Sequence, residues 1–517
     1  MTITELQQQY AAHPNMAVMK RLLKDTSVQT VFCGGLCASA ASLFSSVLVQ
    51  EGGCPFVFIL GDLEEAGYFY HDLTQILGTE RVLFFPSSFR RSIKYGQKDA
   101  ANEILRTEVL SRLQKGEEGL CIVTYPDALA EKVVSRKELS NKTLKLNVGE
   151  KVDTTFITDV LHSYGFEYVD YVYEPGQYAV RGSIIDVFSF ASEYPYRIDF
   201  FGDEVESVRT FEVESQLSRE KKDGVSIVPD LAVTGDVTTS FLDFIPKETT
   251  LAMRDFLWLR ERIQVVHDEA LTPQAIAVQE AEENGGITLE GKLIDGSEFT
   301  VRALDFRRLE FGNKPTGTPN ASVTFNTSAQ PIFHKNFDLV ASSFKDYLEK
   351  GYSLYICSDS MKQTDRIKAI FEDRGDKINF TPVERTIHEG FVDNTLRLCI
   401  FTDHQLFDRF HKYNLKSDKA RSGKVALSLK ELNQFTPGDY VVHTDHGIGR
   451  FSGLVRIPNG DTTQEVLKLV FQNEDVVFVS IHSLHKVSKY KGKEGEAPRL
   501  NKLGTGAWEK LKERTKS

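Results

Sequence analysis

The chain has 517 residues, of which 41% are hydrophobic and 26% charged, and its formal net charge is −11 at pH 7. This length is too great for one hydrophobic core, so we expect three to five domains. Because no run of eighteen apolar residues occurs and the first residues are polar, neither a membrane span nor a signal peptide is expected, and the protein is predicted to be cytoplasmic.

The acidic excess lies in residues 1–431, whereas residues 432–517 carry a small basic excess. Neutralising phosphates needs a positive field, so the larger part is expected to bind DNA weakly at most, and protein partners fit better. The six cysteines mostly lie beside apolar, strand-like residues and form no C-x-x-C pair. We therefore expect buried, reduced thiols and no metal centre.

In residues 1–125, short apolar runs alternate with amphipathic stretches. This alternation is typical of a parallel α/β sheet. Strands are predicted at 28–33, 55–60, 81–85 and 119–124, and helices at 63–77 and 99–115.

The segment Gly34–Ser42 follows the first strand and enters a helix, where a phosphate-binding loop would lie. Such a loop needs a lysine for the β and γ phosphates and a hydroxyl for magnesium. In that register Ser39 replaces the second glycine, Ala40 the lysine and Ala41 the hydroxyl residue. We expect a degenerate, non-functional loop without a cofactor. An ordinary glycine turn into a helix predicts the same absence of activity.

Residues 126–211 read as a helix followed by an antiparallel β-meander. Asp186 and Asp199 lie on neighbouring strands, and cross-strand pairing with Arg181 or Arg197 is favoured over an acid/base pair. Arg181 precedes Gly182, where a bulge can aim the guanidinium outward as a recognition group, the alternative being a solvated charge. The helix is predicted at 154–164 and strands at 171–173, 178–180, 184–188, 196–200 and 205–211.

Residues 212–325 have a weaker pattern, with a helix at 256–262 and loops at 281–286 and 314–319. Residues 326–411 again alternate, which predicts a small α/β spacer domain, and 412–431 form a linker whose residues 412–424 are expected to be mobile. In the spacer, helices are predicted at 339–350 and 361–374, and strands at 352–357 and 396–401.

Residues 432–498 contain several short strands separated by turns, which predicts a small SH3/Tudor-like β-barrel. Pro437-Gly438 is a turn, and Tyr440 begins a strand. Gly447 and Gly449 predict a double-glycine turn, where the backbone can take positive φ or approach a neighbour closely before the chain extends again. Residues 465–471 and 476–481 read as a hairpin with a polar loop at 472–475.

Leu454 and Ile457 follow the glycines and are expected to present an apolar strand edge to a partner strand. The alternative is that they fill the barrel core, which the two-residue period predicts for at least one of them.

Two histidines in this region form an H-x-x-H pattern, His443 and His446. They lie beside a strand and a turn rather than on a helix, and no third ligand has suitable spacing. We therefore interpret them as turn residues. No Ser/His/Asp or Cys/His spacing identifies a nucleophile, so no catalytic residue is predicted.

Two segments resemble known families. Residues 438–451 with 478–486 resemble the polymerase-interacting module of the bacterial transcription-repair coupling factor and the CarD regulators, and 503–510 resemble the connector to that family's motor. Residues 178–188 with 197–206 resemble the domain that the family shares with the excision-repair subunit UvrB. The resemblance implies a multi-domain α/β and α+β protein: a degenerate P-loop-type domain (1–125, completed by 212–325), an inserted β-meander (126–211), the spacer, and the barrel.

The resemblance also implies partners. The β-meander would bind UvrA through Arg181, with Phe188 as a weaker candidate, and Ile457 would anchor the β subunit of RNA polymerase, with Leu454 beside it. ATP and magnesium are expected only for the family's motor domains. Residues 499–517 would be a connector helix towards that motor, so the chain is expected to be the non-motor half of a longer protein that is an ATP-driven DNA translocase.

Two other classes remain open. A UvrB-like ATPase or helicase would need nucleotide binding despite Ala40, and a CarD-like regulator acting at promoter DNA would need affinity for duplex DNA at physiological salt.

Overall fold

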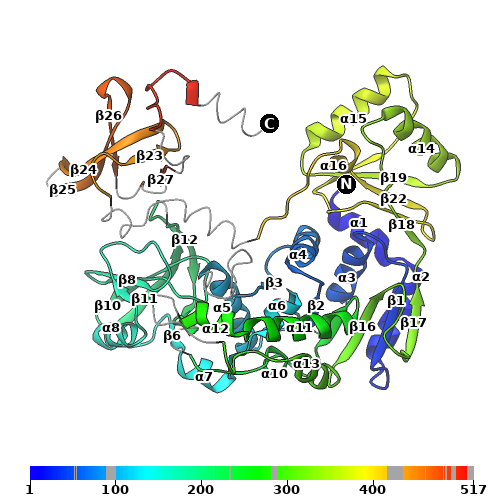
Figure 1. The fold of residues 1–517 in the computed structure, drawn as a ribbon, viewed down its shortest axis with the longest axis horizontal. Helices are drawn as coiled ribbons and strands as arrows, with labels where there is room; N and C mark the ends of the chain where they lie inside the picture. Colours follow the sequence, from blue (N-terminus) through cyan, green and yellow to red (C-terminus); the bar gives the residue numbers. More distant parts are fainter. Residues whose placement is uncertain are drawn as a thin grey trace. The chain divides into compact units, whose positions relative to one another are not determined.

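The computed structural model divides the chain into two compact units, one of residues 1–142 and 231–415 and the other of 143–230 and 416–517 (Figure 1). The residues that it describes are 1–51, 53, 55–88, 100–213, 215–231, 235–280, 289–415, 435–459, 462–480, 483, 486–490 and 497–508.

A seven-stranded sheet, in which every pairing is parallel, forms the centre of the first unit. Its order is β17-β1-β16-β15-β2-β4-β3, and β2, β3, β4 and β15 are buried along their whole length, as expected of strands covered on both faces. The strands are β1 Thr30–Gly34, β2 Phe56–Ile59, β3 Val82–Phe85, β4 Cys121–Thr124, β15 Thr250–Met253, β16 Arg307–Gly312 and β17 Ala321–Thr324.

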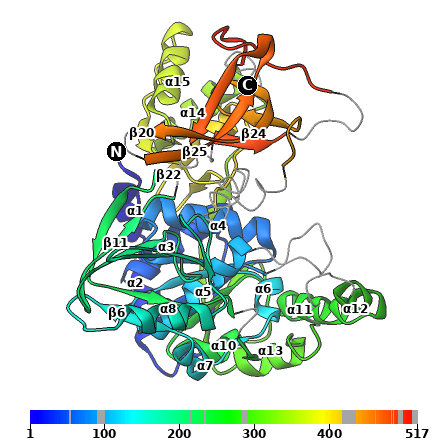
Figure 2. The same ribbon diagram turned by 90° about the vertical axis from the view of Figure 1, so that its left-hand side faces the viewer.

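Helices lie on both sides of this sheet. Figures 1 and 2 show α3 and α4 on one side, and α10, α11 and α13 on the other. The helices are α1 Ile3–Ala11, α2 Pro14–Lys24, α3 Ala40–Glu51, α4 Leu63–Leu77, α5 Ala100–Gln114, α6 Pro126–Ala130, α7 Arg136–Asn141, α10 Phe241–Phe244, α11 Phe256–Ala270, α12 Pro273–Glu280 and α13 Gly296–Ala303, and a small ribbon pairs β5 Val133–Val134 with β14 Val237–Thr239.

The strands β15 and β16 come late in the chain yet lie between β1 and β2. Residues 231–325 therefore complete the sheet that residues 1–125 begin. The predicted strands and helices of the N-terminal quarter are confirmed, and each end lies within two residues of its predicted position. The helix α11 extends the predicted helix at 256–262 as far as Ala270.

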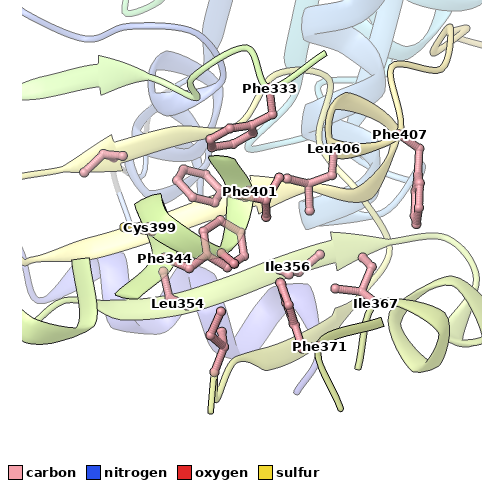
Figure 3. Packing of buried hydrophobic residues seen from close by; sticks show 14 residues of the cluster. Phe333, Phe344, Leu354, Ile356, Ile367, Phe371, Cys399, Phe401, Leu406 and Phe407 are labelled. Atoms are coloured by element: carbon pink, nitrogen blue, oxygen red, sulfur yellow. The ribbon is translucent and has the colours of Figure 1, made fainter. Parts of the chain in front are cut away.

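A smaller five-stranded sheet follows in the same unit, in the order β18-β21-β22-β19-β20. Figure 3 shows the rings of Phe344, Phe371 and Phe401 packed against one another, with Phe344 5.9 Å from Phe371 and 5.4 Å from Phe401 between ring centroids. The elements are β18 Thr327–Ala329, β19 Ser353–Ser358, β20 Thr381–Glu384, β21 Phe391–Asp393, β22 Leu398–Thr402, α14 Phe337–Glu349, α15 Met361–Asp373 and α16 Asp403–Leu406.

In the second unit, residues 143–230 form a six-stranded sheet, in the order β12-β11-β10-β9-β8-β7, and a β6–β13 ribbon. The helix α8 buries Ile157 and Leu161 in a core with Ile185 and Ile198 of the sheet. The elements are β6 Leu144–Asn147, α8 Thr154–Ser163, β7 Glu167–Tyr168, β8 Gln177–Arg181, β9 Ile184–Val187, β10 Tyr196–Phe201, β11 Glu204–Phe211, β12 Ser218–Lys222 and β13 Gly224–Ile227.

Two predictions for this part are wrong. Residues 171–173 form no strand, because Tyr173 N–H donates to the side chain of Gln177 instead of to a ladder partner. The expected bulge at Gly182 does not occur either: Arg181 faces Ile184 in a regular hairpin, and Gly182, at φ 59°, occupies its tight turn.

The C-terminal part contains a five-stranded antiparallel sheet in the order β26-β25-β24-β23-β27. The predicted hairpin is confirmed, with a short 3₁₀ turn η1 Gln472–Glu474 in its loop, and closure of the sheet into a barrel stays a prediction. The strands are β23 Tyr440–His443, β24 Gly447–Asn459, β25 Thr462–Val470, β26 Val476–Ser480 and β27 Val487–Lys489.

The prediction of positive φ or close approach at the two glycines is confirmed. Gly447 has a φ of 83°, whereas Gly449 is a strand residue paired with Val441, and β24 runs through both. A Cβ atom at Gly449 would lie 3.0 Å from the ring of Phe471, so this glycine makes room for a core aromatic rather than for a turn.

Five cysteines, at positions 33, 37, 121, 357 and 399, are free thiols, and all but Cys37 are buried, which confirms the predicted burial for those four. No helix in the described part of the chain combines the length and apolar character needed to cross a membrane. The predictions for the loop at 281–286, for linker residues 416–431 and for helix residues 509–517 lie outside the described residues.

Candidate functional site

The loop after β1 keeps the position of a phosphate-binding loop but not its chemistry. The strand ends at Gly34, the helix α3 begins at Ala40, and Ser39, Ala40 and Ala41 are all buried. No cationic side chain stands where the phosphate-binding lysine would be, as the sequence predicts.

Two backbone N–H groups of this loop have protein partners. Cys37 N–H donates to Thr327 Oγ1 at 2.8 Å, and Ser39 N–H donates to the carbonyl of Glu389 at 3.1 Å. Such N–H groups are the ones that cradle phosphates in a working loop. Here Thr327 of β18 and Glu389 of the loop before β21 supply the acceptors for these N–H groups.

The carboxylate of Asp72 in α4 also faces the start of α3. Ser39 Oγ and Ser42 Oγ each donate to its Oδ2 at 2.7 Å, and His388 N–H donates to its Oδ1 at 2.8 Å. Burial raises the pKa of Asp72 to about 6, and the two hydroxyls act in the opposite direction. A protein anion thus occupies the helix end that would otherwise attract a phosphate.

In the β-meander, the predicted cross-strand pairing is confirmed for Asp186. This carboxylate is fully buried and forms ion pairs with Arg181 and Arg197, the latter through Nε at 2.8 Å and Nη2 at 3.0 Å. Asp199 instead accepts from Ser183 Oγ at 2.9 Å. Arg181 keeps 36% of its side chain exposed, so it is both a structural partner and a surface cation.

Phe188 is buried with Val172, Ala179 and Phe211 and presents no surface in this structure. The large exposed side chains of this domain lie elsewhere: Tyr168 is 59% exposed, and Phe201, at the β10–β11 turn, is 78% exposed. Sequence reasoning missed Phe201 because period-2 alternation marks an aromatic residue as buried, whereas the strand ends there.

In the C-terminal sheet, Leu454 and Ile457 lie on the second half of β24. A bulge after Phe451 separates this half from the first, and Leu454 and Ile457 pair with Leu467 and Gln464 of β25. Within the described residues, β23 pairs with β24 only as far as Arg450, so the other edge of residues 454–458 has no strand partner. Leu454 is 37% exposed and Ile457 is half-buried, and the core cluster that the described residues form includes neither side chain. Their assignment to a strand edge rather than to the core stays a prediction.

The H-x-x-H histidines stack on each other with ring centroids 4.6 Å apart. His443 Nδ1 accepts the N–H of Asp445 at 3.1 Å, and Asp445 pairs with Lys486. These contacts fit the predicted turn role.

The residues after the sheet fold back on this turn. Ile448 and Asn501 exchange hydrogen bonds, with Ile448 N–H donating to Asn501 Oδ1 at 2.8 Å, and Trp508 Nε1–H donates to the carbonyl of Thr444 at 2.8 Å. A Cβ atom at Gly447 would lie 2.6 Å from Asn501, so this glycine permits a contact that the sequence did not reveal.

Three histidines, His388, His404 and His411, also come together in the first unit. No sequence signal points to them, because they lie on separate segments without ligand spacing.

Comparison with known proteins matches the two recognition domains. A model described as the UvrB interaction domain matches residues 144–232, and one described as the CarD-like/TRCF RID domain matches residues 435–491. The fold and these matches define a multi-domain protein in which two separate segments are similar to domains described as interaction domains.

Transcription-repair-coupling factors are similar along almost the whole chain. Those of Bacillus subtilis (strain 168) and of Staphylococcus aureus (strain bovine RF122 / ET3-1) are each 23% identical, in gapped alignments of 560 and 552 positions that cover 93% and 92% of this chain. The matches cover 47% and 46% of these relatives, so the chain spans about half their length. The protein is transcription-repair-coupling-factor-like and corresponds to their N-terminal half.

Proposed function

We propose that this chain is an adaptor that binds the β subunit of RNA polymerase through its C-terminal sheet and UvrA through the β-meander domain. The observation that supports polymerase binding is the edge of β24 at residues 454–458, which pairs with no strand among the described residues and lies in the segment that matches the RID domain. A free strand edge offers main-chain hydrogen bonds, and exposed Leu454 and half-buried Ile457 offer apolar contacts beside it.

The second half of the proposal places UvrA on the β-meander around Arg181. Its guanidinium is partly exposed, is held above the ring of Tyr171 with its Cζ 5.1 Å from the centroid, and donates to the carbonyl of Asp170. These contacts fix its direction, which favours recognition of a carboxylate on a partner. Buried Phe188 would act by supporting the sheet rather than by touching UvrA.

Replacing Arg181 by alanine tests this site, because Arg197 alone still holds Asp186 through two hydrogen bonds. We expect R181A to weaken UvrA binding about 10- to 100-fold, which corresponds to about 1.5–3 kcal/mol for a charge-assisted contact. The measurement is biolayer interferometry of the purified chain on immobilised UvrA.

The matched control is R197A, which removes the less exposed partner of the same carboxylate. UvrA affinity that falls equally in both variants, or in neither, contradicts a recognition role for Arg181. Polymerase binding is measured in parallel and should not change in either variant.

The adaptor proposal assigns no nucleotide chemistry to this chain. The missing lysine, the engaged N–H groups of Cys37 and Ser39, and Asp72 all support this. We therefore expect no saturable binding of Mg·ATP at millimolar concentration in equilibrium dialysis and no phosphate release. Saturable binding that an S39A/S42A variant alters would favour the UvrB-like ATPase instead.

A further inference from the structure

The clustered histidines His388, His404 and His411 lie on different segments of the small α/β domain. His388 follows β20, His404 belongs to α16, and His411 lies five residues beyond that helix. One ring nitrogen of each lies within 4.8 Å of the corresponding nitrogens of the other two.

Two of these nitrogens are already at the spacing that a shared metal ion requires. His388 Nδ1 and His411 Nδ1 are 3.1 Å apart, while two ligands of a tetrahedral zinc ion with bonds of about 2.05 Å lie about 3.3 Å apart. The rings of His404 and His411 are stacked, 4.3 Å apart at 12°. Because the nitrogen lone pairs lie in the ring planes, binding one ion would require the stacked rings to rotate out of their parallel arrangement.

Each of the three residues is held in place by a further contact. Tyr68 of α4 stacks on His388, with ring centroids 3.4 Å apart, and its hydroxyl donates to the carbonyl of His411 at 2.7 Å. His404 Nε2 lies 2.7 Å from the carbonyl of His388, and donation of its proton there leaves Nδ1 with a free lone pair. Metal-binding histidines are typically oriented by such second hydrogen bonds.

Histidine binds a metal ion in its neutral form, through the lone pair of one ring nitrogen. A fourth histidine, His71 of α4, lies 5.1 Å from His411 between ring centroids. Nearby carboxylates at Asp359 and Asp403 provide compensating negative charge.

We propose that His388, His404 and His411 form a binding site for one divalent late first-row transition metal ion, of which zinc is the probe. Nitrogen-only donor sets suit zinc, copper and nickel rather than magnesium or calcium. The site would tie the last residues of the first unit, around His411, to the loop after β20, against α4. It is independent of the polymerase and UvrA sites proposed above.

The test is zinc binding by the full chain after removal of metal with EDTA and dialysis. Isothermal titration with zinc sulfate should give one ion per chain, and zinc should raise the thermal unfolding temperature. Both effects should disappear in the H388Q/H411Q variant and persist in H162Q/H334Q, which changes two exposed histidines outside the cluster. No zinc uptake by the wild type, or equal uptake by H388Q/H411Q, overturns the proposal.

A measurement on the wild type guards against misfolding of that variant, because His388 also packs on Tyr68. X-ray absorption at the zinc edge should show nitrogen or oxygen neighbours at about 2.0 Å and no sulfur. A sulfur shell would place the ion on a cysteine and would equally overturn the proposal.

Discussion

Substituting Ile457 with aspartate is expected to abolish binding to RNA polymerase while UvrA binding stays intact. The change places a charge on a half-buried apolar position beside the edge of β24 that has no strand partner in the described part of the chain, where an incoming strand would have to desolvate the charge. Loss of an apolar anchor at an interface costs about 2–4 kcal/mol, which is about a 30- to 1,000-fold rise in Kd. Surface plasmon resonance on immobilised polymerase β subunit measures this Kd.

The matched control is Val476→Asp. Val476 is 40% exposed and lies on β26, at the outer edge of the same sheet. The V476D variant should retain polymerase binding, since the proposed contact lies on β24. A V476D variant that loses binding as fully as I457D, or an I457D variant that binds as well as wild type, would place the polymerase surface elsewhere. Circular dichroism should be unchanged in both.

Substituting Gly35 with alanine is expected to unfold the first unit. The φ of Gly35 is 82°, and an added Cβ atom would lie 1.9 Å from the carbonyl oxygen of Phe325, a backbone atom that cannot turn away. Separating β1 from the chain after β17 would break hydrogen bonds such as Phe325 N–H to Gly34 O. We expect a loss of more than about 4 kcal/mol in the free energy of unfolding.

Gly116→Ala separates the backbone cost of a positive φ from the cost of the clash with Phe325. Gly116 has a similar φ of 71° but no atom within 4 Å of an added Cβ, so only the backbone penalty of about 1–2 kcal/mol should appear. In a W508F background, Trp258 of α11 is the sole tryptophan and reports urea unfolding of the first unit. Equal losses in G35A and G116A would mean that the close approach of Phe325 has no energetic weight.

The G35A result also bears on the prediction that this loop does not bind phosphate. In a working loop, glycines let the backbone approach a ligand. Here the same freedom lets the backbone at Phe325 approach instead. The glycine that would permit a phosphate contact in a working loop thus permits a contact within the protein here, between Gly35 and the backbone of Phe325.

Much of the secondary structure could be predicted from local pattern. Buried parallel strands such as β2 and β3 are short apolar runs, and α4 begins at an Asp62 cap and ends at Gly78, both visible in the sequence. The wrong predictions, the strand at 171–173 and the bulge at Gly182, are places where a side chain or a tight turn replaces ladder pairing.

The amino-acid sequence by itself determined the missing lysine of the phosphate loop, the pairing of Asp186 with an arginine on a neighbouring strand, and the likeness to transcription-repair-coupling factors. These depend on residue identity and on short-range alternation. Only the tertiary structure decided that Asp72 and the carbonyl of Glu389 occupy that loop, that the core cluster of the described residues includes neither Leu454 nor Ile457, and that three histidines meet. Those facts depend on contacts between residues tens to hundreds of positions apart, which no local pattern encodes.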